Sequence, residues 1–188
     1  MSLRVIAGMA KGKRLKAPPG TNTRPITDMI KEALFNVLGH DMSGIVFLDL
    51  FAGSGSVGIE ALSRGASRVI FVDSSYHAVK TIKYNLINCN FMDGYEIYRQ
   101  DVFRAINNLQ RHQITFDLIY ADPPFPLDSV FTRVMTAIDD AQILKNHGLA
   151  IIRTPRKKVL PQTIGFLIEY KTSIYGDSCL HYYYKEVK

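Results

Sequence analysis

Tryptophan is absent from the sequence, cysteine occurs twice and no hydrophobic run is long. The two cysteines, Cys89 and Cys179, form no CxxC pair, which excludes a disulfide scaffold and leaves no zinc-ligand spacing, so we predict no metal site. The longest stretch free of Asp, Glu, Lys and Arg has 10 residues. A membrane helix needs ~20 apolar residues, so no bilayer-spanning segment is expected. Two buried thiols are typical of a protein in a reducing cytosol, and we expect a cytoplasmic location.

Acidic residues are also missing from the first 27 positions. The net charge of the chain is +6, and it arises entirely from six basic residues in that segment: Arg4, Lys11, Lys13, Arg14, Lys16 and Arg24. A basic arm on a neutral body favours binding to a polyanion, although a solvated tail would show the same charge. Apolar residues alternate with the basic ones, which favours an arm that folds.

The rest of the chain alternates apolar strands with helices. Its 188 residues, 47% hydrophobic and 21% charged, suit a single folded domain with a small appendage. We predict a basic β-hairpin arm over residues 1–20 and a main domain over residues 21–188. Strands are expected at 45–50, 68–73, 94–98, 115–121, 148–153, 164–171 and 179–187, and helices at 27–38, 57–64, 75–88, 102–111 and 127–144.

Such continuous apolar strands are typical of a parallel sheet that is covered on both faces. The last two strands are separated by the short turn YGD, so they must run antiparallel to each other. The predicted fold is therefore α/β and Rossmann-like. It has a seven-stranded, mostly parallel sheet with helices on both faces, an antiparallel terminal strand and the small N-terminal β-hairpin.

The first motif that carries chemistry is DLFAGSGSVG, residues 49–58, between the first long strand and its helix. It contains GxGxxG, which fits both an NAD-dependent dehydrogenase and an S-adenosylmethionine enzyme. Asp49 stands at the strand end, where it would repel a pyrophosphate and attract the ammonium of an amino-acid ligand. The chain also has no second half large enough for a dehydrogenase substrate domain. Both details favour S-adenosylmethionine.

The second motif is Asp122-Pro123-Pro124-Phe125, at the end of the fourth strand. The prolines have no N–H and stiffen the loop, so carbonyl acceptors stay available beside the Asp122 carboxylate. Two acceptors side by side can bind the NH₂ of a base and draw its nitrogen toward tetrahedral geometry, while Phe125 stacks on the ring. The freed lone pair would then attack a sulfonium methyl directly. A plain stiff loop is the alternative interpretation.

These motifs, together with acids Asp73 and Asp101, resemble the class I S-adenosylmethionine-dependent amino-methyltransferases. RVIAGxxKGxxL from Arg4, RPITDxxKEALFNVL from Arg24 and DLFAGSGSVGIEALSRGA from Asp49 further resemble the bacterial 16S ribosomal RNA guanine-N2 methyltransferase family. The resemblance covers roughly residues 3–185. One departure is Met29, where the family usually has Arg after RPxxD, and this puts one RNA or phosphate contact in question.

The resemblance implies a role for each motif residue. The methionine part of the cofactor would be bound by Asp49, Phe51, Ala52, Gly53, Ser54, Gly55 and Gly58. Asp73 would bind the ribose, and Asp101 with Val102 the adenine. Asp122, Pro123, Pro124 and Phe125 would hold the guanine amine. RNA would be contacted by Arg4, Lys11, Lys13, Arg14, Lys16 and Arg24, and residues 24–28 would close over the cofactor.

The predicted function is methylation of the exocyclic N2 amine of a guanine in 16S ribosomal RNA, with S-adenosylmethionine as cofactor. The expected partner is ribosomal RNA in an assembled or assembling small subunit, and the expected state is a monomer. A DNA adenine-N6 methyltransferase is one alternative, but no run here is long enough for its usual target-recognition insert. A protein glutamine methyltransferase is a second alternative, but the motif of those enzymes has Asn at the position of Asp122. A non-catalytic RNA-binding module fits the arm alone, and the intact motifs weigh against it.

Overall fold

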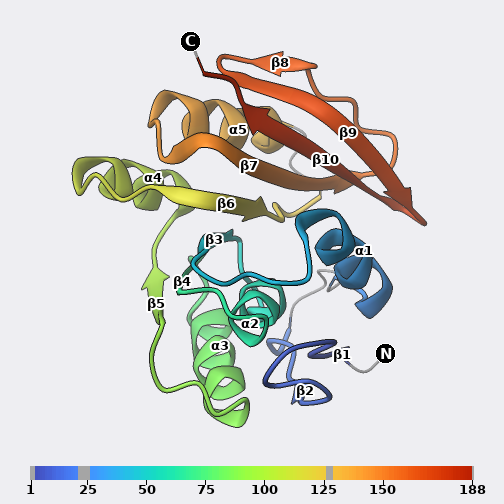
Figure 1. Ribbon diagram of the computed structural model, residues 1–188, viewed down its shortest axis with the longest axis vertical. Coiled ribbons are helices and arrows are strands. Elements are labelled where there is room, and N and C mark those ends of the chain that lie inside the picture. Colours follow the sequence, from blue (N-terminus) through green and yellow to red (C-terminus); the bar gives the residue numbers. More distant parts are fainter. Residues whose placement is uncertain (1–2, 21–25, 126–128, 188) are drawn as a thin grey trace.

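The computed structural model describes residues 3–20, 26–125 and 129–187, and it shows an α/β fold around one large sheet (Figure 1). The sheet has eight strands in the order β5-β4-β3-β6-β7-β10-β9-β8. The strands are β3 (Val46–Leu50), β4 (Arg68–Asp73), β5 (Tyr95–Arg99), β6 (Phe116–Ala121), β7 (Leu144–Pro155), β8 (Thr163–Ile164), β9 (Leu167–Tyr175) and β10 (Ser178–Lys185). The five helices of the described residues are α1 (Asp28–Leu38), α2 (Ser56–Ser63), α3 (Tyr76–Asn88), α4 (Val102–Arg111) and α5 (Val130–Asp140).

Strands β3 to β7 are parallel, and β10 runs antiparallel to both of its neighbours, β7 and β9. This confirms the mostly parallel sheet and its antiparallel strand near one edge. The predicted count of seven strands is wrong by one short strand, because the expected strand at 164–171 is interrupted. Gly165 has φ +57° and turns the chain, so that Ile164 of β8 pairs with Leu167 of β9.

The two faces of the sheet carry two separate hydrophobic clusters, which explains why its strands read as continuous apolar runs. In β4, Ile70 and Val72 pack toward α4 and α5, whereas Val69 and Phe71 pack toward α1, α2 and α3. Helices therefore cover both faces, as predicted. The helix expected at 127–144 is shorter, because Leu144 already begins β7.

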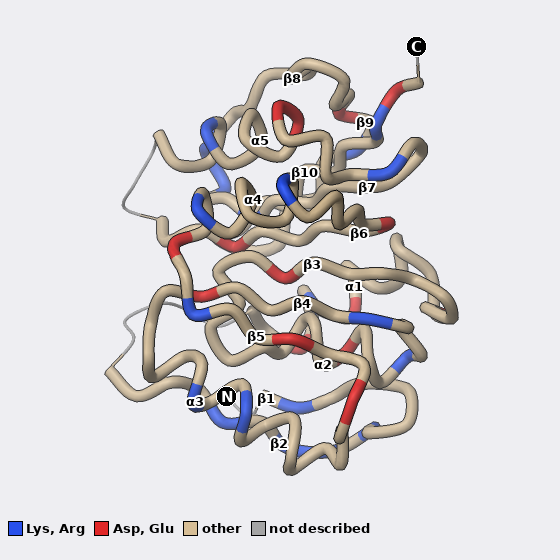
Figure 2. The backbone as a smooth tube through the Cα atoms, turned by 90° about the vertical axis from the view of Figure 1, so that its left-hand side faces the viewer, with Lys and Arg blue, Asp and Glu red and all other residues tan. Residues whose placement is uncertain are grey.

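The N-terminal segment forms the predicted hairpin, with β1 (Leu3–Arg4) antiparallel to β2 (Arg14–Leu15). It lies at the opposite end of the molecule from β8 (Figures 1 and 2). Its apolar residues Val5, Ala10 and Leu15 are buried in the cluster under α1, α2 and α3. Gly8 lies so close to α2 that a Cβ would stand 1.7 Å from the carbonyl oxygen of Ser63, so only glycine fits there. The hairpin is thus packed onto the main body.

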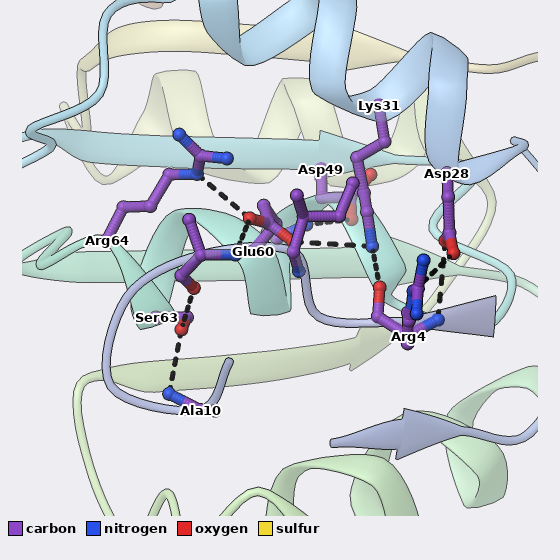
Figure 3. A network of polar contacts seen from close by, with 11 residues as sticks. Arg4, Ala10, Asp28, Lys31, Asp49, Glu60, Ser63 and Arg64 are labelled. Atoms are coloured by element: carbon purple, nitrogen blue, oxygen red, sulfur yellow. Dashed lines mark hydrogen bonds and ion pairs between the residues drawn. The ribbon is translucent and has the colours of Figure 1, made fainter. Parts of the chain in front are cut away.

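A buried ionic network fastens the hairpin to α1 and α2 (Figure 3). Glu60 of α2 accepts hydrogen bonds from the backbone N–H groups of Ile6 and Ala7, at 2.8 and 3.0 Å. Its carboxylate also pairs with Lys31 at 3.4 Å and Arg64 at 2.9 Å, and the Glu60 and Lys31 side chains are completely buried. Lys31 donates in turn to the Arg4 carbonyl at 2.6 Å. Burial lowers the pKa of Lys31, and the Glu60 carboxylate opposes that shift.

The network predicts that Glu60→Gln destabilises the protein strongly. Removing one partner leaves a buried charge without compensation, which costs about 3–5 kcal/mol. The free energy of unfolding from urea denaturation measures this loss. Lys145→Met is the matched control, because it breaks the Lys145–Asp117 pair, whose side chains are 40% and 29% exposed, and should cost less than about 1 kcal/mol. Equal losses in the two variants would contradict a structural role for the network.

Candidate active site at the carboxyl edge of the sheet

The glycine motif and the DPPF motif follow two neighbouring strands. From β3, the chain adds β4 and β5 toward one edge of the sheet. It then returns to add β6 and β7 toward the other edge, so the strand order reverses between β3 and β6. Leu50 pairs with Ala121, and the Asp122 N–H donates to the Leu50 carbonyl at 3.2 Å. Ligands of open α/β sheets bind at such a switch point, beyond the carboxyl ends of the strands.

The glycine loop turns sharply between β3 and α2. Phe51, Gly53 and Gly55 all have positive φ, at 57°, 56° and 74°. The loop is held by bonds from Ala52 N–H to the Val72 carbonyl at 3.0 Å and from Gly55 N–H to the Ala52 carbonyl at 2.7 Å. A non-glycine residue at φ +57° is uncommon, and its persistence at Phe51 indicates a backbone held by its surroundings.

Gly58 stands apart from the rest of the loop because it lies inside α2, against the sheet. A Cβ at Gly58 would meet the ring of Phe71 at 2.3 Å, so its small size permits close helix–sheet packing. Its N–H donates to Asp49 at 3.0 Å. Gly58 therefore supports the loop through packing and through Asp49.

Three carboxyl groups surround this loop, from Asp49, Asp73 and Asp122. Asp49 is 2% exposed, and burial raises its pKa well above the ordinary value, with further increases from Asp122 and Asp73. Asp73 accepts from the N–H groups of Gly53 and Ser75, both at 2.8 Å, and a carboxylate has further lone pairs for a ligand. So many acids disfavour a phosphate and favour a cation. In the described ranges, no group of three His, Cys, Asp or Glu residues is arranged to hold a metal ion.

Asp101 and Val102 lie at the start of α4, near the Asp73 side of the site. The Asp101 carboxylate caps the helix by accepting from the N–H groups of Phe103 and Arg104, at 3.0 and 3.2 Å. Val102 is buried at 3% exposure. A hollow of about 640 Å³ opens here, lined by Ser74, Arg99, Gln100, Asp101, Arg104, Asn107, Asn108 and Arg111. The fold therefore brings the strand ends that carry Asp73 and Asp101 to one side.

The DPPF motif forms the other side of the site. Asp122 accepts a hydrogen bond from Arg153 of β7 at 2.9 Å, and Phe125 packs against Phe131 with ring centroids 6.5 Å apart. Burial raises the pKa of Asp122, whereas Arg153 opposes that rise. The sequence analysis did not assign Arg153 a role. Its one signal was a charged residue in the otherwise apolar strand GLAIIR.

The basic residues of the hairpin are all exposed where the structure describes them. Basic positions, drawn in blue, follow the hairpin near β1 and β2 in Figure 2, whereas Arg24 lies outside the described residues. Arg4 pairs with Asp28 at 3.1 Å, and the Lys16 ammonium stands 3.8 Å from the centre of the Tyr84 ring.

A buried asparagine, also missed by the sequence analysis, joins the hairpin to the glycine loop. The Asn85 side chain bonds both the N–H and the carbonyl of Lys16, at 2.8 and 2.9 Å. The same amide donates to the Ser54 carbonyl at 2.9 Å. The arm and the loop are therefore in contact through one side chain.

Known proteins include relatives that match nearly the whole chain. The chain is 41% identical to YlbH of Bacillus subtilis, described as a candidate rRNA methyltransferase, over 93% of this chain and 94% of that protein. It is 32% identical to the ribosomal RNA small subunit methyltransferase D of Haemophilus influenzae, over 92% and 90%. A crystal structure described as a methylase of Haemophilus influenzae matches with a TM-score of 0.80 at 27% identity, over 100% of both chains.

A more distant structure shares the fold. It is an RNA methyltransferase of Salinibacter ruber in complex with S-adenosyl-L-homocysteine, with a TM-score of 0.68 and 14% identity over 88% of this chain and 95% of that one. The family model described as Conserved hypothetical protein 95 matches residues 3–184. The resemblance seen in the sequence is confirmed, and the chain belongs to this family, together with the ribosomal RNA small subunit methyltransferase D of Haemophilus influenzae.

Proposed function

We propose that this protein is an S-adenosylmethionine-dependent methyltransferase that modifies the exocyclic N2 amine of a guanine in small-subunit ribosomal RNA. The observation that carries the proposal is the pairing of β3 with β6, which sets an acid-lined glycine loop beside Asp122. The names of the relatives support ribosomal RNA as the substrate. The choice of guanine N2 rests on the family resemblance and on the amine-binding chemistry of the DPPF motif.

The residues around the glycine loop fit the cofactor. S-adenosylmethionine supplies a methyl group activated by a sulfonium, and it carries no phosphate. The Asp73 carboxylate attracts positive charge and would repel the pyrophosphate of a dinucleotide. We assign the methionine part to the loop backbone from Phe51 to Gly55, the ribose to Asp73, and the adenine to Asp101 with the backbone of Val102.

The DPPF motif is suited to an exocyclic amine. An ionised Asp122 accepts only, and Pro123 and Pro124 contribute no N–H groups that could compete with the amine. Two accepted hydrogen bonds would hold the nitrogen with its lone pair directed at the methyl group. Phe125 would stack on the base. Side chains thus bind and orient the amine, and positioning of this kind is itself a large source of rate acceleration.

The hairpin is proposed as the RNA-binding arm, with residues 1–20 as the arm and 21–188 as the methyltransferase domain. Its exposed lysines and arginines would contact phosphates, which makes affinity for RNA dependent on salt.

We infer that the protein acts in the cytoplasm as a monomer on an assembled or assembling small subunit. So short an arm suits the recognition of RNA shape and one accessible base. Within the described residues no helix is long and apolar enough to cross a bilayer.

Isothermal titration tests the cofactor. We expect S-adenosylhomocysteine to bind and NADH not to bind, because the acids around the loop oppose a pyrophosphate. Asp73→Ala should weaken S-adenosylhomocysteine binding about tenfold or more, since hydrogen bonds to a charged group are lost. Binding of NADH alone would contradict the proposed function.

Asp122→Ala should lower methyl transfer to small-subunit RNA at least about 100-fold, because the amine loses its charged acceptor. S-adenosylhomocysteine affinity should stay within about twofold, since Asp122 contacts the base side of the site. Transfer of a radiolabelled methyl group measures the first quantity and titration the second. Asp140→Ala, at an exposed acid that ends α5, is the control and should keep full activity. An Asp122→Ala enzyme with normal turnover would rule out the assigned role.

Lys11→Glu with Lys13→Glu should weaken RNA binding and reduce the slope of log affinity against log salt by roughly 1.4 or more, since each phosphate contact contributes about 0.7–0.9. Filter binding to small subunits and to naked 16S RNA, at several salt concentrations, also shows which substrate is preferred.

The matched control for this charge reversal is Arg133→Glu with Lys171→Glu. It changes the net charge equally, at exposed residues of α5 and β9 rather than the hairpin. An equal loss of RNA affinity in the control would mean that overall charge, and not the arm, governs binding.

A further inference from the structure

Arg153 is a buried cation whose orientation is set from two sides. It is 3% exposed, and it lies in β7 between β6 and β10. Its Nη1 donates to Oδ2 of Asp122 at 2.9 Å, while its Nε and Nη2 both donate to Oγ of Ser178 at 3.1 and 3.0 Å. The serine, on β10, thus holds one side of the planar guanidinium while the other side points at the DPPF motif.

We propose that Arg153 is a positioning residue for methyl transfer: by binding one oxygen of Asp122, it keeps that carboxylate ionised and presents its other oxygen to the amine of the acceptor base. The inference rests on the function proposed above. It adds a residue that lies in neither the glycine motif nor the DPPF motif. Asp122 is 21% exposed at its side chain, so it stays within reach of a base while Arg153 binds it from inside the protein.

The surroundings of Asp122 show why a cation is needed. The nearby groups Asp49 on β3 and Tyr120 on β6 carry no positive charge; burial raises the pKa of both, and Asp122 raises it further. Burial raises the pKa of Asp122 itself, and the Arg153 guanidinium opposes that rise. A buried carboxylate with no counter-charge would take up a proton and become a donor on that oxygen. A protonated Asp122 could present an O–H to the amine in place of an acceptor.

Arg153 also contacts the other end of the motif. Its guanidinium carbon stands 5.1 Å from the centre of the Phe125 ring. Cations at such distances are attracted to the face of an aromatic ring. One side chain therefore spans Asp122 and Phe125 and sets the distance between the amine acceptor and the stacking surface.

The test compares pH profiles of turnover on small subunits for the wild type and Arg153→Met. The acid limb of kcat follows ionisation of Asp122. Loss of Arg153 raises the pKa of Asp122, so the limb should move to higher pH by about one unit or more. At pH values below the limb we expect a fall of about tenfold or more in kcat, and the deficit should shrink as the pH rises above the limb. Affinity for S-adenosylhomocysteine should change less than about twofold.

Three further variants separate positioning from stability. Arg153→Lys retains the charge and should keep the acid limb near that of the wild type. Arg153→Gln removes the charge but keeps a polar side chain, and it should shift the limb, which keeps the test open if Arg153→Met does not fold. Lys185→Met is the matched control, because Lys185 is a cation of β10, 9% exposed, that donates to the Leu144 carbonyl at 2.8 Å. It should lower stability and leave the limb unmoved.

The outcomes distinguish the two proposals. A wild-type protein that methylates no small-subunit RNA overturns the proposed function and this inference with it. An active wild type whose Arg153→Met and Arg153→Gln variants keep the wild-type acid limb overturns the inference alone. A limb shift of equal size in Lys185→Met would also overturn it, because the shift would then report general destabilisation.

Discussion

The parallel pairing of β3 with β6 is the interaction on which the rest of the site depends. These strands are adjacent in the sheet although their last residues, Leu50 and Ala121, are 71 positions apart in the sequence. The hydrogen bond from Asp122 to the Leu50 carbonyl closes the gap between the two motifs. Without that adjacency, the glycine loop would be a generic turn and DPPF a stiff loop. With it, an electrophilic methyl group and a base amine can be bound on either side of one crevice.

A second constraint links the arm to the site. Glu60 lies two residues beyond the end of the glycine motif, and its carboxylate accepts from the hairpin backbone and pairs with Lys31 of α1 (Figure 3). Asn85 joins Lys16 to Ser54 in the same region. The hairpin is therefore placed by buried hydrogen bonds that end on elements of the cofactor side. An RNA-binding arm fixed in this way would present its phosphate contacts at a constant distance from the reacting base, and no flexible linker would have to be ordered on binding.

Charges of opposite sign are concentrated in different parts of the molecule, acidic at the site and basic on the hairpin. Asp73 and Asp122 contribute negative charge where a cationic cofactor is proposed to bind, and the hairpin concentrates positive charge at the opposite end of the molecule from β8 (Figure 2). Arg153 compensates the negative charge of Asp122 from inside the protein, because its own side chain is buried. A single balanced surface could not favour both a sulfonium and a polyanion.

Local patterns in the sequence predicted most of the fold and both motif-based halves of the site. The Thr27 cap and the Ile30–Leu34 spacing indicated α1, and continuous apolar runs indicated the parallel strands, because these signals depend only on neighbours along the chain. The glycine and DPPF loops were visible for the same reason. The sequence could not show that Gly165 interrupts the penultimate strand, or that Gly8 is pressed against Ser63. Arg153 meeting Asp122, and Glu60 meeting Ile6 and Ala7, were also decided by the tertiary structure alone. Those partners lie 31 and more than 50 positions apart, and only the order and register of the folded strands and helices determine which distant side chains share one buried volume.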